Sequence, residues 1–275
     1  GVGTTTIYVQ VAADANHTTK DCGSKTVEIT KRNVTLTAGS SSRAWNGSAL
    51  TNSTCTAASG QLVSGHTATC AMTSASTITV ASSTVGTSAS VNNTINTVTI
   101  KKGSVDVTSS YSITKATGTL TISYATPTIS LTAKEADYTG SAIAANTASA
   151  SPNSSPTFTY TYYTDSSCST KTATSHGASA AGGAPSLAGQ YYVKASAAAV
   201  STKTNAASSG CVSHKIKAVA ATCPTLTAYS GAYDGNSHSI TVSGGSGGTI
   251  QYRTSTSGNW SNTKPNGGPD VGTTT

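Results

Sequence analysis

The sequence repeats itself, and the length of the repeat limits what this chain can fold into. The tripeptide Leu-Thr-Ala occurs at residues 36–38, 131–133 and 226–228, so consecutive copies lie 95 residues apart. Each copy is followed at a similar distance by an aromatic residue, a polar residue and glycine, at residues 45–47, 138–140 and 233–235. A unit of about 90 residues can bury a core of its own, so this period predicts separate domains in a row and not a continuous solenoid.

A longer period is superimposed on the shorter one. The string VGTTT occurs at residues 2–6 and again at residues 271–275, which gives a repeat of 269 residues. We therefore expect three related domains per repeat. Residues 33–124 and 125–216 would each be a whole domain, residues 1–32 the C-terminal part of a third, and residues 217–275 the N-terminal part of the next copy of that third domain.

Short segments of alternating hydrophobic and polar residues predict β-strands. Side chains two residues apart lie on the same face of a strand, so each run offers one apolar face to a core. No segment has helical spacing, and charged residues make up only 9% of the chain. The pattern predicts an all-β fold made of antiparallel β-sandwich domains. The clearest runs contain Ile7, Val9 and Val11; Val27 and Ile29; Leu120 and Ile122; and Tyr191, Val193 and Ala195.

Six cysteines allow fifteen pairings, and the predicted domain boundaries favour one of them. Cys55 pairs with Cys70, Cys168 pairs with Cys211, and Cys22 pairs with Cys223 across the repeat junction. A disulfide that closes about 15 residues stabilises a domain by about 3 kcal/mol, and such bonds persist only in an oxidising compartment. This pairing predicts an extracellular protein. Buried free thiols in a reduced protein are the alternative, with metal ligation a weaker one because no CxxC motif or Cys/His cluster is present.

No combination of residues points to catalysis, a metal site or a cofactor. The nine acidic residues are dispersed, and no nucleophile elbow, zinc-protease, phosphate-loop or calcium-loop motif occurs. The net charge of +7 is spread thinly, and the basic pairs at 31–32 and 101–102 have no aromatic residues between them, so we expect no nucleic-acid binding. The segment contains no membrane span. The histidines are expected at turns or on the surface: His17, His66, His176, His214 and His238.

Three longer stretches carry a resemblance to known modules. Residues 33–122 resemble a module of bacterial surface proteins in NVTLTAGSSSRAWNGSALTN, QLVSGHTATC and VTSSYSITKATGTLTI. Residues 127–216 resemble a second module in PTISLTAKEADYTGSAIAAN, TYTYYTDSSCSTKT and ASAAGGAPSLAGQYYVKAS. The third stretch, PTLTAYSGAYDGNSHSITVSGGSGGTIQYRTS, continues as VGTTTIYVQVAAD and KTVEITK and resembles the MBG type of bacterial immunoglobulin-like domain. The resemblance implies a tandem array of immunoglobulin-like β-sandwiches on a large secreted or cell-surface protein, where such domains act mainly as a stalk.

These observations lead to three functional hypotheses, none of them enzymatic. The first is a structural repeat segment of an extracellular surface fibre or adhesin stalk, whose partners are adjacent copies of the same repeat. The second is an adhesin module that binds host or environmental glycans or surface proteins, with Trp260 and Tyr229 as the expected contact residues. The third is a protomer of a head-to-tail filament, completed by strand donation from its neighbour.

Overall fold

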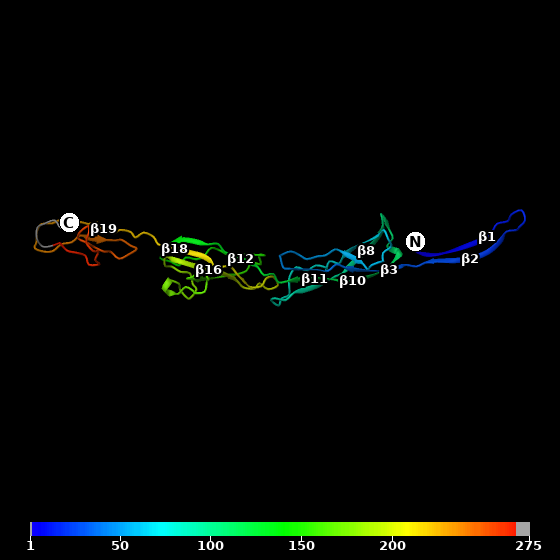
Figure 1. Ribbon diagram of the computed structural model, residues 1–275, viewed down its shortest axis with the longest axis horizontal. Helices are drawn as coiled ribbons and strands as arrows, with labels where there is room; N and C mark the ends of the chain where they lie inside the picture. The colour runs from blue at the N-terminus through cyan, green and yellow to red at the C-terminus, as the bar shows by residue number, and fades with distance from the viewer. Residues whose placement is uncertain (1, 268–275) are drawn as a thin grey trace. The chain divides into compact units, whose positions relative to one another are not determined.

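The chain is all-β, as predicted. The computed structural model describes residues 2–267, which form short strands, turns and two 3-10 helices, η1 (Thr108–Ser110) and η2 (Thr174–His176) (Figure 1). No α-helix occurs in residues 2–267. The strands pair into several small sheets, an arrangement compatible with β-sandwiches. By contact density the chain divides into two compact units, and each is described by itself. The predicted domain boundaries stay a prediction.

The first unit contains residues up to 132, 147–160 and 194–210. Its strands up to residue 72 are β1 (Gly3–Val11), β2 (Lys20–Ile29), β3 (Arg32–Ala38), β4 (Ser41–Ala44), β5 (Cys55–Ala57) and β6 (His66–Met72). Those that follow are β7 (Ala89–Asn93), β8 (Ile95–Lys102), β9 (Val105–Asp106), β10 (Tyr111–Ala116), β11 (Gly118–Ser123), β12 (Thr128–Ser130), β14 (Ser149–Ser151) and β17 (Ala207–Ser208).

Between residues 32 and 123 the first and last strands run side by side. Strand β10 pairs in parallel with β3, with Tyr111 opposite Arg32, and β11 pairs in parallel with β4. On its other edge β3 pairs in antiparallel fashion with β5, which gives the sheet order β10-β3-β5. The sheets β4-β11-β7 and β6-β8-β9 complete this region. The parallel closing strand thus fills the edge of β3 that β5 leaves free.

The alternation in these strands places apolar side chains in buried clusters. Val34, Leu36 and Ile100 pack together in one cluster, and Leu120 and Ile122 pack with Trp45 in a second. All six side chains are 7% exposed or less. A third cluster of the same unit contains Ile129, Ala148, Ala195 and Ala197. Aliphatic residues fill most of these cores, as the single Phe and two Trp of the sequence require.

The second unit contains residues 133–146, 161–193 and those from 211 onward. Strand β13 (Lys134–Asp137) pairs in parallel with β18 (Val212–Lys217), with Lys134 opposite His214. Strand β18 also pairs in antiparallel fashion with β16 (Gly189–Ala197), which β15 (Phe158–Tyr163) borders in the sheet order. A separate two-stranded sheet is formed by β19 (Thr225–Thr227) and β20 (Thr241–Ser243).

Candidate functional site

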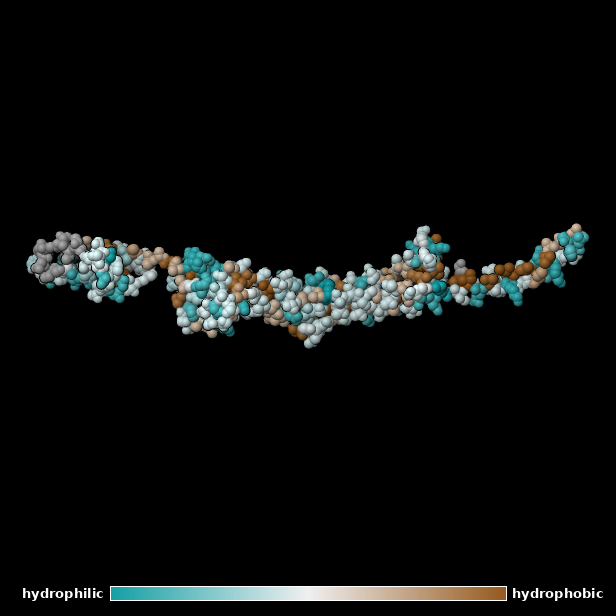
Figure 2. Space-filling view, viewed as in Figure 1, coloured by the Kyte–Doolittle hydropathy of each residue, from teal (hydrophilic) through white to brown (hydrophobic). Residues whose placement is uncertain are grey.

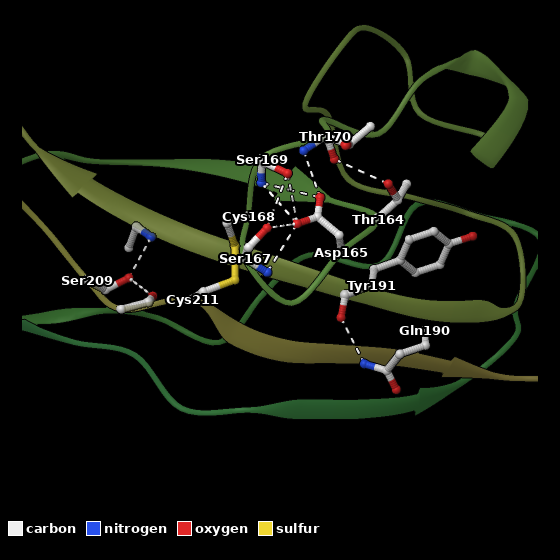
Figure 3. Close-up of a disulfide and its surroundings, with 12 residues drawn as sticks. Thr164, Asp165, Ser167, Cys168, Ser169, Thr170, Gln190, Tyr191, Ser209 and Cys211 are labelled. Carbon is white, nitrogen blue, oxygen red and sulfur yellow. Dashed lines mark hydrogen bonds between the residues drawn. A yellow bond between two sulfur atoms is a disulfide. The ribbon is translucent and has the colours of Figure 1, made fainter.

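Two disulfides lie between residues 55 and 211, and each joins two segments that are close in the fold. Cys55 of β5 is bonded to Cys70 of β6, across 15 residues. Cys168 is bonded to Cys211, which immediately precedes β18, across 43 residues (Figure 3). These are the two within-domain pairs expected from the sequence. An all-β chain with two disulfides is compatible with an extracellular structural domain.

The loop that holds Cys168 is organised by one carboxylate. Asp165 accepts hydrogen bonds from the backbone N–H of Thr170 at 2.7 Å and from the hydroxyl of Ser169 at 3.0 Å, and also from the hydroxyl of Ser167 (Figure 3). The Ser167 hydroxyl, followed by the backbone N–H of Thr170, holds the pKa of Asp165 well below its usual range. Cys168 has a φ of +54°, a left-handed conformation that is unfavourable for a residue with a Cβ. The Asp165 hydrogen bonds fix the turn that imposes it.

His214 is fully buried, so the expectation that every histidine lies at a turn or on the surface is wrong for this residue. Its ring packs edge-on against Tyr162, with the ring centroids 5.2 Å apart. Burial lowers the pKa of His214, and the nearby charge of Lys134 lowers it further. The sequence does carry a signal for this position, because Val212, His214 and Ile216 alternate along β18 and all face the interior. The interior of the second unit therefore favours the neutral form of the His214 imidazole.

The β1–β2 hairpin carries an apolar face that no other part of residues 2–267 covers. Every residue of both strands is exposed. Five aliphatic side chains, Ile7, Val9, Val11, Val27 and Ile29, are between 47% and 57% exposed. Figure 2 shows these hydrophobic residues as a row along the hairpin. The expectation that this face packs on a core is not met within the described chain. Alternation determines which side chains share a face and not what covers that face.

A shallow hollow on the same hairpin contains a free cysteine. Ile7, Val9 and Val27 line this hollow, of about 260 Å³, together with Cys22. The thiol of Cys22 thus lies beside the aliphatic side chains. Within residues 2–267 it is not bonded to another cysteine, and it is exposed. On the opposite face Thr6 pairs with Thr26.

The segment from residue 221 to residue 267 encloses an open cavity of about 1340 Å³. Its apolar lining comes from both strands of the β19–β20 sheet, from the segment between them and from the chain that follows them, with Leu226, Val242, Ile240, Ile250 and Tyr252 among the lining residues. Several of these side chains remain exposed, Leu226 at 63%. The second free and exposed cysteine of the described chain, Cys223, also lines this cavity.

The two aromatic residues expected to contact a ligand lie in the lining of this cavity. Trp260 is 56% exposed, and the guanidinium of Arg253 lies 4.3 Å from the centroid of its ring. Tyr229 is stacked on His238 with centroids 3.9 Å apart. His238 in turn lies 2.8 Å from the carboxylate of Asp234, and this hydrogen bond, with that of the Asn236 backbone, lowers the pKa of Asp234 to about 2. Their role in ligand binding stays a prediction.

The pairing of Cys22 with Cys223 also stays a prediction. Both thiols are free, and each lies on an exposed apolar surface, one on the hairpin and one in the cavity. The sequence predicts that these two cysteines form a bond. It does not predict the hollow that Cys22 lines or the cavity that Cys223 lines.

Comparison with known proteins found no matching family model and no matching curated protein. Within residues 2–267, no three His, Cys, Asp or Glu side chains gather in a group that could hold a metal ion. No helix of that same range is long and apolar enough to cross a membrane.

Proposed function

We propose that this chain is a structural repeat segment of an extracellular surface fibre or adhesin stalk, built from immunoglobulin-like β-sandwich domains and without enzymatic activity. The observation that carries the proposal is that a similar arrangement recurs along the chain. Parallel pairing of early with late strands, β3 with β10 and β4 with β11, closes the region of residues 32–123, and a second parallel pair, β13 with β18, lies in the next. Each region has its own disulfide.

Physical reasons support this assignment. Small domains whose cores are mostly aliphatic have a low free energy of unfolding. Disulfides raise it, because they reduce the entropy of the unfolded chain. The outward faces of the strands carry Thr and Ser, which keep a low-charge chain hydrated. The resemblance to modules of bacterial surface proteins over residues 33–122 and 127–216 points the same way. The expected partners are adjacent copies of the same repeat.

The proposal is tested on the native material by measuring its mass on a denaturing gel with and without reductant. A stalk made of covalent tandem repeats runs as a very large chain that stays large after reduction. Electron microscopy of the same material should show rods whose length increases with the number of repeats. Compact particles of a single repeat would contradict the proposal.

A second candidate function, glycan or protein binding, is favoured by one observation. Trp260 offers a largely exposed ring next to the Arg253 guanidinium, and exposed aromatic side chains beside a cation are common in recognition sites. A glycan array with the 275-residue chain tests this candidate. Binding that Trp260→Ala abolishes and Trp45→Phe retains would support it, because Trp45 is buried in a core. No signal on the array would favour the stalk alone.

A further inference from the structure

We propose that the β1–β2 hairpin of a second copy of this chain occupies the cavity of residues 221–267, with β2 running parallel to β19 and with Cys22 bonded to Cys223. This inference rests on the proposed stalk function and specifies how one copy of the repeat joins the next. It combines two observations, a missing strand and the placement of two thiols, with a register inferred from a pair of strands already present.

The missing strand is seen when equivalent sheets are compared. Strand β3, which contains the first Leu-Thr-Ala motif, has β5 on one edge and the parallel strand β10 on the other. Strand β19, which begins the third motif, has the antiparallel strand β20 on one edge. Within residues 2–267 no strand pairs with its other edge. Strand β2 likewise pairs with β1 alone. An isolated two-stranded sheet is marginally stable in water, so both sheets are short of a partner.

The register follows from strands that are already paired. In the second unit Lys134, the residue after Leu-Thr-Ala, lies opposite His214, two residues before the last inward side chain, Ile216. The equivalent residue after the third motif is Tyr229. If Ile29 takes the place of Ile216, the residue opposite Tyr229 is Val27.

Five residues earlier along both strands, this register brings the two cysteines to within one residue of each other. Cys22 then lies opposite Pro224, and because neighbouring side chains point to opposite faces, the bond further requires that β2 shift by one residue, which sets Cys22 opposite Cys223. Adjacent strands are about 4.8 Å apart, which is within the Cα separation that a disulfide spans. A shift of β2 by one residue from the register of the paired strands therefore permits the bond.

The two surfaces are chemically matched. Ile7, Val9 and Val27 line the hollow together with Cys22, and Leu226 and Ile250 are among the residues that line the cavity together with Cys223. Joining these surfaces removes aliphatic side chains of both from water, which is the main favourable contribution to protein association. The surfaces also carry charge of opposite sign, because Lys25, which lies opposite Ile7, lines the hollow, and Asp234 is among the residues that line the cavity.

The bond itself requires an oxidant. The two thiols lose two protons and two electrons to a disulfide compound of the oxidising compartment, which is reduced to two thiols as the Cys22–Cys223 bond forms by exchange. Oxidised glutathione supplies this chemistry in vitro.

The test uses the 275-residue chain in a buffer of oxidised and reduced glutathione. We expect a ladder of oligomers on a non-reducing gel, which reductant collapses to the single chain. Tryptic mapping should show the peptide of residues 21–25 joined to that of residues 218–253. Two free thiols per chain, a bond of Cys22 to Cys22 or of Cys223 to Cys223, or an internal bond in a monomer would each overturn the proposal.

A matched pair of variants separates docking from thiol chemistry. Val27→Asp places a carboxylate on the docking face, whereas Thr26→Asp places the same group on the opposite face. We expect Val27→Asp to reduce the yield of the ladder about tenfold or more, since an unpaired charge must be desolvated, and Thr26→Asp to leave it unchanged. Equal effects of the two variants would overturn docking through this face.

Two controls make the result interpretable. The bonds Cys55–Cys70 and Cys168–Cys211 in the same peptide maps report that each variant has folded. The stalk proposal is judged on the native mass, which does not depend on Cys22. A very large native chain without the Cys22–Cys223 bond would therefore reject this inference and leave the stalk proposal in place.

Discussion

The same sequence motif has opposite environments in two regions of this molecule. Leu36 of the first Leu-Thr-Ala motif is fully buried, and Leu226 of the third is 63% exposed. The last inward residue of β18, Ile216, is 2% exposed, and the equivalent Ile29 of β2 is 55% exposed. Residues 32–217 contain both disulfides, and the segments that flank them contain both free thiols.

The comparison identifies what buries these side chains. In the region of residues 32–217 a late strand lies parallel to an early one, at β10 with β3 and at β18 with β13. The flanking segments have the alternation and the turns but not this parallel pair. Alternating hydrophobic residues are therefore sufficient to form a strand here, while the parallel closing strand is what completes a core.

The largest expected effect distinguishes the two disulfides from the two free thiols. Replacing both Cys168 and Cys211 by Ala should lower the free energy of unfolding by about 4 kcal/mol. Replacing both Cys55 and Cys70 by Ala should lower it by about 3 kcal/mol, because the Cys55–Cys70 bond closes the shorter loop. Urea unfolding with amide exchange of β18 and β6 as local probes measures this. Replacing Cys22 and Cys223 in the monomeric chain is the control and should change neither value. A reversed order of the two disulfides would contradict the loop-length argument.

The next effect compares a buried with an exposed aliphatic residue. Leu120→Ala should cost about 3 kcal/mol, since it leaves a cavity beside Trp45 in a closed core. Ile7→Ala on the hairpin should cost less than about 0.5 kcal/mol in the monomeric chain. Urea unfolding followed by Trp45 fluorescence, in a Trp260→Phe background, measures both. Similar costs for the two substitutions would mean that the hairpin is packed in solution.

A smaller effect is a pH dependence of the free energy of unfolding, which we expect only in the region of residues 32–217, where parallel strands complete the cores. Burial holds the pKa of His214 below its ordinary value of 6.5, so the unfolded chain takes up a proton first as the pH falls. The free energy of unfolding should therefore decrease as the pH is lowered through about 6.5 and continue to decrease until the folded-state pKa is reached. His214→Phe should reduce this slope. An unchanged slope in the variant would assign the effect to another group.

The smallest effect concerns the loop around Cys168. The Ser167 hydroxyl and the Thr170 N–H depress the pKa of Asp165 from 3.8, so its contribution to stability is present above that pH and is lost as the pH falls below it. Asp165→Asn should lower the melting temperature at neutral pH and reduce the further loss on acidification. Asp21→Asn on the hairpin is the matched control, because the Asp21 carboxylate likewise accepts a hydrogen bond from a backbone N–H, that of Gly23. It should leave the melting temperature of residues 32–217 unaltered.

The sequence predicted the periodic features of this structure and missed those that depend on neighbours. Alternation at Leu120 and Ile122 correctly indicated a strand with a buried face. The pairs Cys55–Cys70 and Cys168–Cys211 followed from the period, because each pair lies within one interval of it. The residue type of His214 favours the surface, and only its place between Val212 and Ile216 in the alternation indicates burial. The exposed face of β1–β2 could not be predicted, since coverage depends on a surface distant in sequence.

The central claim is that an open cavity and an exposed hairpin of different copies complete one further domain. Amide hydrogen exchange of a two-repeat chain, residues 1–269 followed directly by residues 1–275, tests it in a dilute monomeric sample. The account predicts that the hairpin at the junction exchanges as slowly as β16 and β18, while the hairpin of the first repeat exchanges fast. Equally fast exchange in both hairpins would contradict it.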